Sequence, residues 1–502
     1  MKRPQEVARG AVSAIREGLV ALAGQSERTL MLGTILLASS ASAVTIFVLN
    51  QYFSIDALSS LIFVPDDCTF DWGVKVGRHC FSDYVLPSTF GALPNPWASH
   101  VVDLPDNSSR ELGLSNYPAA AMLPQMTFGL LGGWLHAPGI GLFAYLFALT
   151  IAVLSPALWA AGGARGLERV VIFFACGMAA VPAWMAVDRG NSAGFLAPIA
   201  LVFLLALSRR RWGVVAIAVI LAGLVKPQFA VLGFALVVGR QWRLSGITLI
   251  AIAVTNIAAY LLWPQDFPRT ILQSLHNTAG YGSFKALIGL NVSFGKGLLT
   301  IPDALEARSA GGAVPVGFLA GPRAFIGYGI LLLIIGALLI LGKRISPVMA
   351  GIVLLATAAL FPAVALPYYL VFALPIAAVV VRDPDGSPGT GVFDRCEAIG
   401  GHRRAVGVCV SIATAFSIAH IAIPGPSIRA EMPEILQPDG VQRAVVTTTA
   451  GFASLLWLVA CGVIIASYAR LPACSPGGDA DLSAGYGIEP GENDAPAHVS
   501  KS

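Results

Sequence analysis

The stretch LMLGTILLASSASAVTIFVLN, residues 30–50, decides the fold class, because no charged side chain interrupts it. A helix needs about 20 predominantly apolar residues to cross the hydrocarbon core of a bilayer. Basic residues precede the stretch, and no small-residue cleavage site follows a short apolar core. These features predict an uncleaved first spanning helix with a cytoplasmic N-terminus.

The rest of the chain is similarly apolar. Of its 502 residues, 56% are hydrophobic and 12% are charged, whereas soluble domains typically carry about 25% charged residues. Because the deficit extends along nearly the whole length, we predict an all-α, polytopic membrane helix bundle of about 12 (11–13) spanning helices. The lipid bilayer is therefore an expected partner, and a nucleic acid is not. The predicted spans are 30–50, 119–135, 139–162, 170–187, 193–208, 213–239, 244–262, 324–342, 347–361, 366–382, 405–424 and 444–468.

The polar segments define the predicted domains. Residues 1–29 form a cytoplasmic N-terminus, and residues 30–470 form the membrane domain. The Gly-, Ser-, Pro- and Asp-rich residues 471–502 are predicted to be a disordered cytoplasmic tail. The external loops, which we expect to lie as short interfacial helices over a membrane cavity, are 51–118, 263–323 and 425–442.

Clusters of basic residues predict the topology, since cytoplasmic loops carry an excess of Lys and Arg. SRRRW (208–212) and GRQWR (239–243) look cytoplasmic. Twelve simple spans would place the first cluster outside. We therefore favour two short helices in 213–239, split at Lys226, over the alternative of an external arginine cluster bound to lipid phosphate.

The first external loop carries a candidate general base. Asp66, Asp67, Asp71 and Asp83 lie within this loop, and aromatic and apolar residues surround Asp71. A carboxylate against apolar walls can have a raised pKa and serve as a base; the alternative is an ordinary surface aspartate. Asp66 and Asp67 invite a metal hypothesis, but no His or Glu stands at ligand spacing, so a solvated or capping role is favoured.

Cys68 and Cys80 bracket the most polar part of this loop, CTFDWGVKVGRHC. They share a short segment on the predicted outer, oxidising face. A disulfide between them is therefore plausible.

Two cations lie beside apolar runs, where ionisable residues are costly and point to function. The fork of Arg189 and the point charge of Lys226 suit a phosphate, although snorkelling at helix ends is the alternative. Asn191 and Gln228 add neutral hydrogen-bonding groups for sugar hydroxyls or phosphate oxygens.

Two later segments are less specific. HNTAGYGSFKALIGLNVSFGKG (276–297) suggests a mobile lid or an ordinary loop. FPAVALPYYLVFALP (361–375) places Tyr368 and Tyr369 between prolines, which an interfacial aromatic belt also explains.

The order of these segments, over about residues 30–380, resembles the C-type (GT-C) glycosyltransferases. Within them, it looks closest to the bacterial polyprenyl-phosphate-mannose-dependent α-1,2-mannosyltransferases of actinobacterial envelope synthesis. Tyr368 and Tyr369 stand where that family often has histidine. The motifs that carry the resemblance are FDWGVKVG (70–77, with Asp71 in the Asp position and Lys75 replacing a tyrosine), LPNPW (93–97), NYPAAAMLP (116–124), RGNSAG (189–194) and LNVSFGKGL (290–298).

The resemblance implies an inverting transferase on the outer face of the plasma membrane. It would move mannose or another hexose or pentose from a polyprenyl-phosphate donor to a glycolipid or glycan acceptor. Asp71 would be the general base, and cations would stabilise the leaving phosphate without a metal or other cofactor. The expected phosphate contacts are Arg189, Lys226, Arg78 and Lys285 (or Lys296), and the expected sugar or acceptor contacts are Asn116, Tyr117, Asn191, Gln228, Asn291, Tyr368 and Tyr369.

Two other functions compete with this one. A transporter or flippase is expected to have repeated halves with matched broken helices, and the sequence indicates one break, at Lys226. A lipid-linked glycan polymerase or ligase would concentrate basic residues in a late external loop. The basic residues of 263–323 keep that alternative open.

Overall fold

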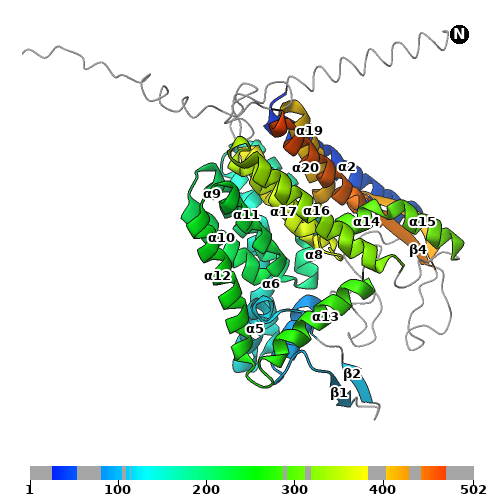
Figure 1. Cartoon of the computed structure of the whole chain (residues 1–502). Helices are drawn as coiled ribbons and strands as arrows, with labels where there is room; N and C mark the ends of the chain where they lie inside the picture. Colours follow the sequence, from blue (N-terminus) through cyan, green and yellow to red (C-terminus); the bar gives the residue numbers. More distant parts are fainter. Residues whose placement is uncertain are drawn as a thin grey trace, which may run out of the picture.

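A computed structural model describes residues 25–53, 81–103, 109–112, 115–285, 291–310, 318–382, 403–428 and 443–470, and most of them are helical (Figure 1). The predicted tail, 471–502, and most of the predicted N-terminal segment lie outside these ranges. The helices are α2 (Glu27–Phe53), α4 (Ser82–Gly91), α5 (Ala119–Trp134), α6 (Pro138–Ala161), α7 (Gly166–Phe173), η2 (Phe174–Met178), α8 (Val181–Arg189), η3 (Ser192–Phe195), α9 (Leu196–Ser208), α10 (Trp212–Val225), η4 (Pro227–Gly233), α11 (Phe234–Val238), α12 (Trp242–Ala259), η5 (Tyr260–Leu262), α13 (Arg269–Lys285), α14 (Phe294–Leu298), α15 (Thr300–Ser309), α16 (Ala320–Leu341), η6 (Gly342–Arg344), α17 (Pro347–Leu360), η7 (Pro367–Phe372), α18 (Ala373–Arg382), α19 (Arg403–Ile418), η9 (Thr449–Phe452) and α20 (Ala453–Ala469).

Two small antiparallel sheets accompany the helices. Strands β1 (His100–Asp103) and β2 (Ser109–Leu112) pair with His100 opposite Leu112. Strands β3 (Ala422–Ile428) and β4 (Arg443–Thr448) pair with Ala422 opposite Thr448. The all-α class is confirmed, while these two-stranded sheets were not predicted.

The number of spanning helices differs from the prediction. Five helices are long and apolar enough to cross a membrane, or six if α7–η2 and α8, bent by 49°, form one span. The other predicted spans include six shorter apolar helices of 10–17 residues. The chain is thus a multi-pass membrane protein by helix length and composition, but a bundle of twelve full spans is not confirmed. The five long candidates are Glu27–Tyr52, Pro138–Ala161, Trp242–Leu262, Gly321–Arg344 and Thr449–Ala469.

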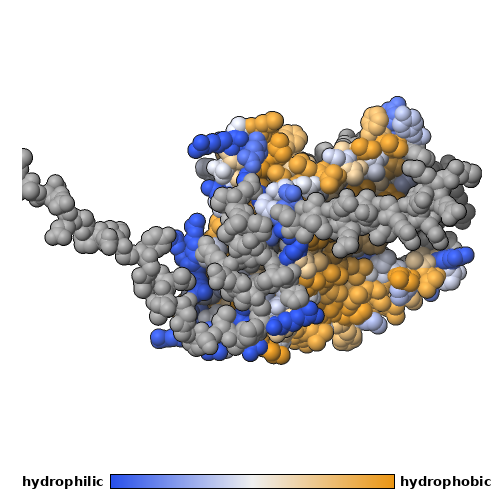
Figure 2. Space-filling view, turned by 90° about the horizontal axis from the view of Figure 1, so that it is seen from above, coloured by the Kyte–Doolittle hydropathy of each residue, from blue (hydrophilic) through white to orange (hydrophobic). Residues whose placement is uncertain are grey.

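Burial separates the lipid-facing helices from the central ones. Along α12, residues such as Leu249, Ile250 and Val254 are exposed, and Figure 2 shows broad hydrophobic flanks. In α17, every residue from Val348 to Leu360 is buried. A helix that is apolar all round belongs inside a bundle, so α17 lies in the core, while the exposed apolar side chains of α12 are compatible with a lipid bilayer.

The split of 213–239 is confirmed. Lys226 is extended, with φ −146° and ψ 111°, as expected for a residue before proline. Pro227 has no N–H to continue the helix. The segment then turns back, so that its two ends meet: a Cβ atom on Gly239 would lie 2.6 Å from the ring of Trp212.

Consequently, the basic turns between the helices gather at one end of the bundle. Leu207 packs against Gly351, which brings the turns at 209–211 and 342–344 together. The short helix η3 leads into α9, and η7 leads into α18. Because η3 contacts η7 and α9 contacts α18, the two helices run in the same direction. Basic residues at this end are Arg209, Arg210, Arg211, Arg240, Arg243, Lys343, Arg344 and Arg382.

Candidate functional site

A buried carboxylate lies at the opposite end, in the first turn of α4. Asp83 is 8% exposed. Its Oδ2 accepts hydrogen bonds from Arg189 Nε and Asn191 Nδ2, both at 2.8 Å, and its Oδ1 accepts one from the Tyr117 hydroxyl at 2.9 Å. Gln125 Nε2 donates to the Asp83 backbone carbonyl at 3.2 Å. The pairing compensates for burying a charge, which is otherwise prohibitive.

A glycine brings these groups together. Gly190 ends α8 with φ +65°, a left-handed conformation that glycine adopts without a steric penalty. A Cβ on Gly190 would lie 2.7 Å from Cβ of Tyr84, so only glycine permits this approach of α8 to α4. The Tyr145 hydroxyl donates to the Gly190 carbonyl at 2.9 Å. The turn presents Arg189 and Asn191 to the same carboxylate.

Lys226 is the second cation of the site. It is 6% exposed, and its Nζ lies 4.5 Å from the Tyr117 ring centroid and 5.9 Å from that of Tyr369. Within the described ranges, it makes no ion pair and no hydrogen bond. A buried ammonium that contacts aromatic rings, with no carboxylate at ion-pair distance in those ranges, is suited to receive an anionic ligand.

Aromatic rings complete the surroundings of the two cations. The Arg189 guanidinium carbon lies 5.5 Å from the Tyr368 ring centroid. The rings of Tyr368 and Tyr369 are 4.9 Å apart. Planar rings beside charged groups are a common arrangement in sites that bind sugars or amphiphilic ligands, because the faces pack against apolar C–H groups.

Electrostatics link α13 to this site. Burial raises the pKa of the Asp83 carboxyl, while the Asn191 hydrogen bond, the Lys226 charge and the Tyr117 hydrogen bond lower it. Burial also raises the pKa of Tyr281, which the charge of Asp83 raises further and that of Arg189 lowers. Tyr281, at the C-terminal part of α13, is therefore within electrostatic reach of Asp83 and Arg189, and the sequence did not indicate it as a site residue.

The structure brings together six of the residues predicted from separate segments: Tyr117, Arg189, Asn191, Lys226, Tyr368 and Tyr369. Gln228 follows two residues after Lys226, and its amide nitrogen is buried without a partner within the described part of the chain. Asn116 precedes Tyr117, and its backbone carbonyl accepts a hydrogen bond from Thr278 at 3.0 Å.

Other predicted residues cannot be placed. Asp71, Arg78, Cys68 and Cys80 lie outside the described residues, as does the Lys285 side chain. The general base expected from the sequence, Asp71, therefore stays a prediction. Of the acidic residues in this loop, the structure describes and buries Asp83. Its position directly before the apolar run YVL, in the first turn of a helix, was the available signal.

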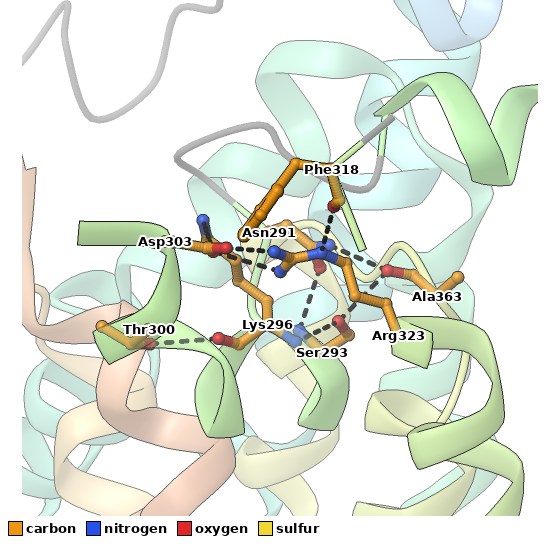
Figure 3. Close-up of polar contacts among 8 residues, drawn as sticks. All are labelled: Asn291, Ser293, Lys296, Thr300, Asp303, Phe318, Arg323 and Ala363. Atoms are coloured by element: carbon orange, nitrogen blue, oxygen red, sulfur yellow. Dashed lines mark hydrogen bonds and ion pairs between the residues drawn. The ribbon is translucent and has the colours of Figure 1, made fainter. Parts of the chain in front are cut away.

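Asn291 has a tethering role (Figure 3). Its Nδ2 donates to the Ala363 carbonyl at 2.8 Å, and its Oδ1 accepts from the backbone N–H groups of Ser293 and Ala365, both at 3.0 Å. These bonds attach the loop before α14 to the loop before η7. Asn291 thereby fixes the segment that leads into Tyr368.

A second charged cluster lies beside this tether. Asp303 accepts hydrogen bonds from Lys296 Nζ at 2.6 Å and from Arg323 Nη1 at 3.1 Å, and it pairs also with Arg323 Nη2 (Figure 3). Arg323 is fully buried. The cluster joins α14, α15 and α16, so Lys296 is engaged by Asp303.

We expect Asn291→Ala to lower the free energy of unfolding by about 1–3 kcal/mol, because it leaves buried backbone groups unpaired. Thermal or denaturant unfolding in detergent would measure the change. Asn256→Ala is the matched control: its Nδ2 donates once, to Ile252 of the same lipid-facing helix, so its loss should be smaller. Equal losses would contradict the tethering role.

The described residues contain no group of three His, Cys, Asp or Glu that could hold a metal ion. Comparison with family models, with curated proteins and with solved structures finds no match.

Proposed function

We propose that this protein is a membrane glycosyltransferase that moves a sugar, mannose or another hexose or pentose, from a polyprenyl-phosphate donor to a glycolipid or glycan acceptor. The observation that carries the proposal is a buried carboxylate, Asp83, beside a buried cation without an ion-pair partner among the described residues, Lys226. A transferase of this kind needs both a base for the acceptor hydroxyl and positive charge for the leaving phosphate.

The chemistry assigns Asp83 the role that the sequence motif suggested for Asp71. Asp83 takes the proton of the acceptor hydroxyl as its oxygen bonds to the anomeric carbon. The bond from that carbon to the phosphate oxygen breaks on the opposite face, and the configuration inverts. Lys226 and Arg189 stabilise the negative charge that develops on the lipid phosphate. Tyr368 and Tyr369 would pack against the sugar.

The distribution of basic residues supports an external site in the plasma membrane. The turns rich in arginine lie at the end of the bundle opposite to Asp83. Basic loops remain on the cytoplasmic side of multi-pass proteins. Asp83 would therefore face the outside, where a lipid-linked donor and an envelope acceptor meet.

One observation favours a transporter as the second candidate. The apolar segments break at two places: at Lys226–Pro227 in the site, and between η2 and α8, the helix that ends at Arg189, with a bend of 49°. Broken helices around a charged site near the bilayer interior are typical of secondary transporters. The sequence alone indicated only the first break.

The two candidates predict different results for purified protein in liposomes given radiolabelled polyprenyl-phosphate sugars and envelope glycolipid acceptors. A transferase is expected to move label from one donor to an acceptor. Transfer from none of the donors, together with accumulation of a labelled solute or lipid across the bilayer, would instead identify a transporter.

A further inference from the structure

Helix α13 presents polar side chains to the protein. Asn277 Nδ2 donates to the backbone carbonyls of Trp97 and Ser115, both at 3.1 Å. Gln273 Oε1 accepts from Asn95 at 3.1 Å, and Ser274 is buried. The inward face of this helix is therefore largely hydrogen-bonded, with Ile271 packed against the hydrophobic cluster around Trp97.

The outward face of α13 exposes two leucines, next to His276. Leu272 is 69% exposed and Leu275 is 62% exposed. The preceding long helix also exposes apolar side chains, among them Ile257, Leu261 and Leu262. A surface helix in water has the opposite pattern, with its apolar side against the protein.

A second helix at the same end has the same reversed pattern. In α15, Asp303 points inward to its two cations, whereas Ile301 and Leu305 are exposed. Both α13 and α15 thus direct polar side chains toward the protein and leucine or isoleucine side chains away from it. This pattern indicates that the surroundings of both helices are apolar. Helix α13 follows the long apolar helix Trp242–Leu262 after a short connection, and both helices expose apolar side chains, so lipid is the occupant that fits.

We propose that α13 lies in the bilayer interface, with Leu272 and Leu275 inserted at the boundary of headgroups and acyl chains, and that its inner face forms a wall of the Asp83 site. Amphipathic helices of this kind bind membranes through such apolar side chains. Tyr281, on the inner face, would then place the site at the depth of the lipid headgroups. The proposal rests on the position of α13 and holds whether or not the site transfers sugar.

Photo-crosslinking in liposomes tests this placement. The photoreactive residue p-benzoylphenylalanine replaces Leu272 or Leu275, one at a time, in the full chain reconstituted in phosphatidylcholine and phosphatidylglycerol. The same residue at Ile250, on the exposed face of α12, is the lipid-facing control. At Arg210, in an exposed turn of the opposite end, it is the aqueous control.

Mass spectrometry of the irradiated protein reads the result. Lipid adducts are expected at positions 272 and 275 at the level found at 250, and well above the level at 210. Adducts at 250 but not at 272 and 275 would overturn the proposal. Crosslinks from 272 and 275 to a second polypeptide in place of lipid would overturn it too, because they would make this face a protein interface.

Discussion

Replacing Asp83 by asparagine is expected to lower the rate of sugar transfer by about 10²–10⁴-fold, the usual contribution of a general base. Asparagine has nearly the same shape, and its carbonyl oxygen can still accept the hydrogen bond of the Tyr117 hydroxyl. It cannot take the proton of an acceptor. The substitution also removes the counter-charge of Arg189, so thermal unfolding must be measured beside the rate.

Two companion variants separate catalysis from folding. Asp83→Glu keeps the charge next to Arg189 but moves the carboxylate by one methylene, so it should retain stability and lose part of the rate. Asp71→Asn tests the aspartate favoured by the sequence motif. If Asp83→Asn stayed active and Asp71→Asn were inactive, Asp71 rather than Asp83 would be the base.

The pH dependence of the wild-type rate provides another readout. A base works only when ionised, and burial raises the pKa of Asp83. The rate should therefore fall as the pH is lowered through that raised pKa, at higher pH than for an exposed aspartate. This acid limb should disappear from the residual rate of Asp83→Asn.

The sequence indicates the cations of the site more clearly than its carboxylate. Arg189 and Lys226 stand beside apolar runs, where a charge is expensive, so their positions alone indicated function. Asp83 lies in a polar loop, where an aspartate is ordinary. Only packing, in which Gly190 approaches Tyr84, shows that Asp83 is the partner of Arg189. Tyr281 likewise gives no local signal and depends on how α13 folds back.

The sequence predicted the all-α class, whereas the predicted number of spanning helices is not confirmed. Hydropathy locates apolar helices correctly, yet it does not show whether a helix crosses the whole bilayer. Here, proline interrupts several apolar segments, as at Pro227 and Pro367, and shorter helices result. These breaks lie beside Lys226 and Tyr368. Residues next to these breaks, Lys226 and Tyr368, therefore belong to the candidate site.

The second large effect is expected for Lys226→Met, which should lower the rate of transfer by about 10²–10³-fold. In other enzymes, removing one preorganised group that stabilises the developing charge has an effect of this size. Methionine fills similar volume and can pack between the Tyr117 and Tyr369 rings, but it supplies no charge to the leaving phosphate. Lys226→Arg keeps the charge and should retain more of the rate. Initial rates with saturating donor would measure both.

The melting temperature of the variant distinguishes a role of Lys226 in phosphate stabilisation from a role in folding. Removing one partner of a buried ion pair usually destabilises a protein, but Lys226 has no carboxylate at ion-pair distance among the described residues. The cost of burying the Lys226 charge, together with its repulsion by Arg189, outweighs its attraction to Asp83. The melting temperature of Lys226→Met should therefore stay equal or rise while transfer falls. Lys343→Met, in the exposed turn at the opposite end, should change neither. An unaltered rate for Lys226→Met, or a loss of rate that merely follows unfolding, would remove Lys226 from the chemistry.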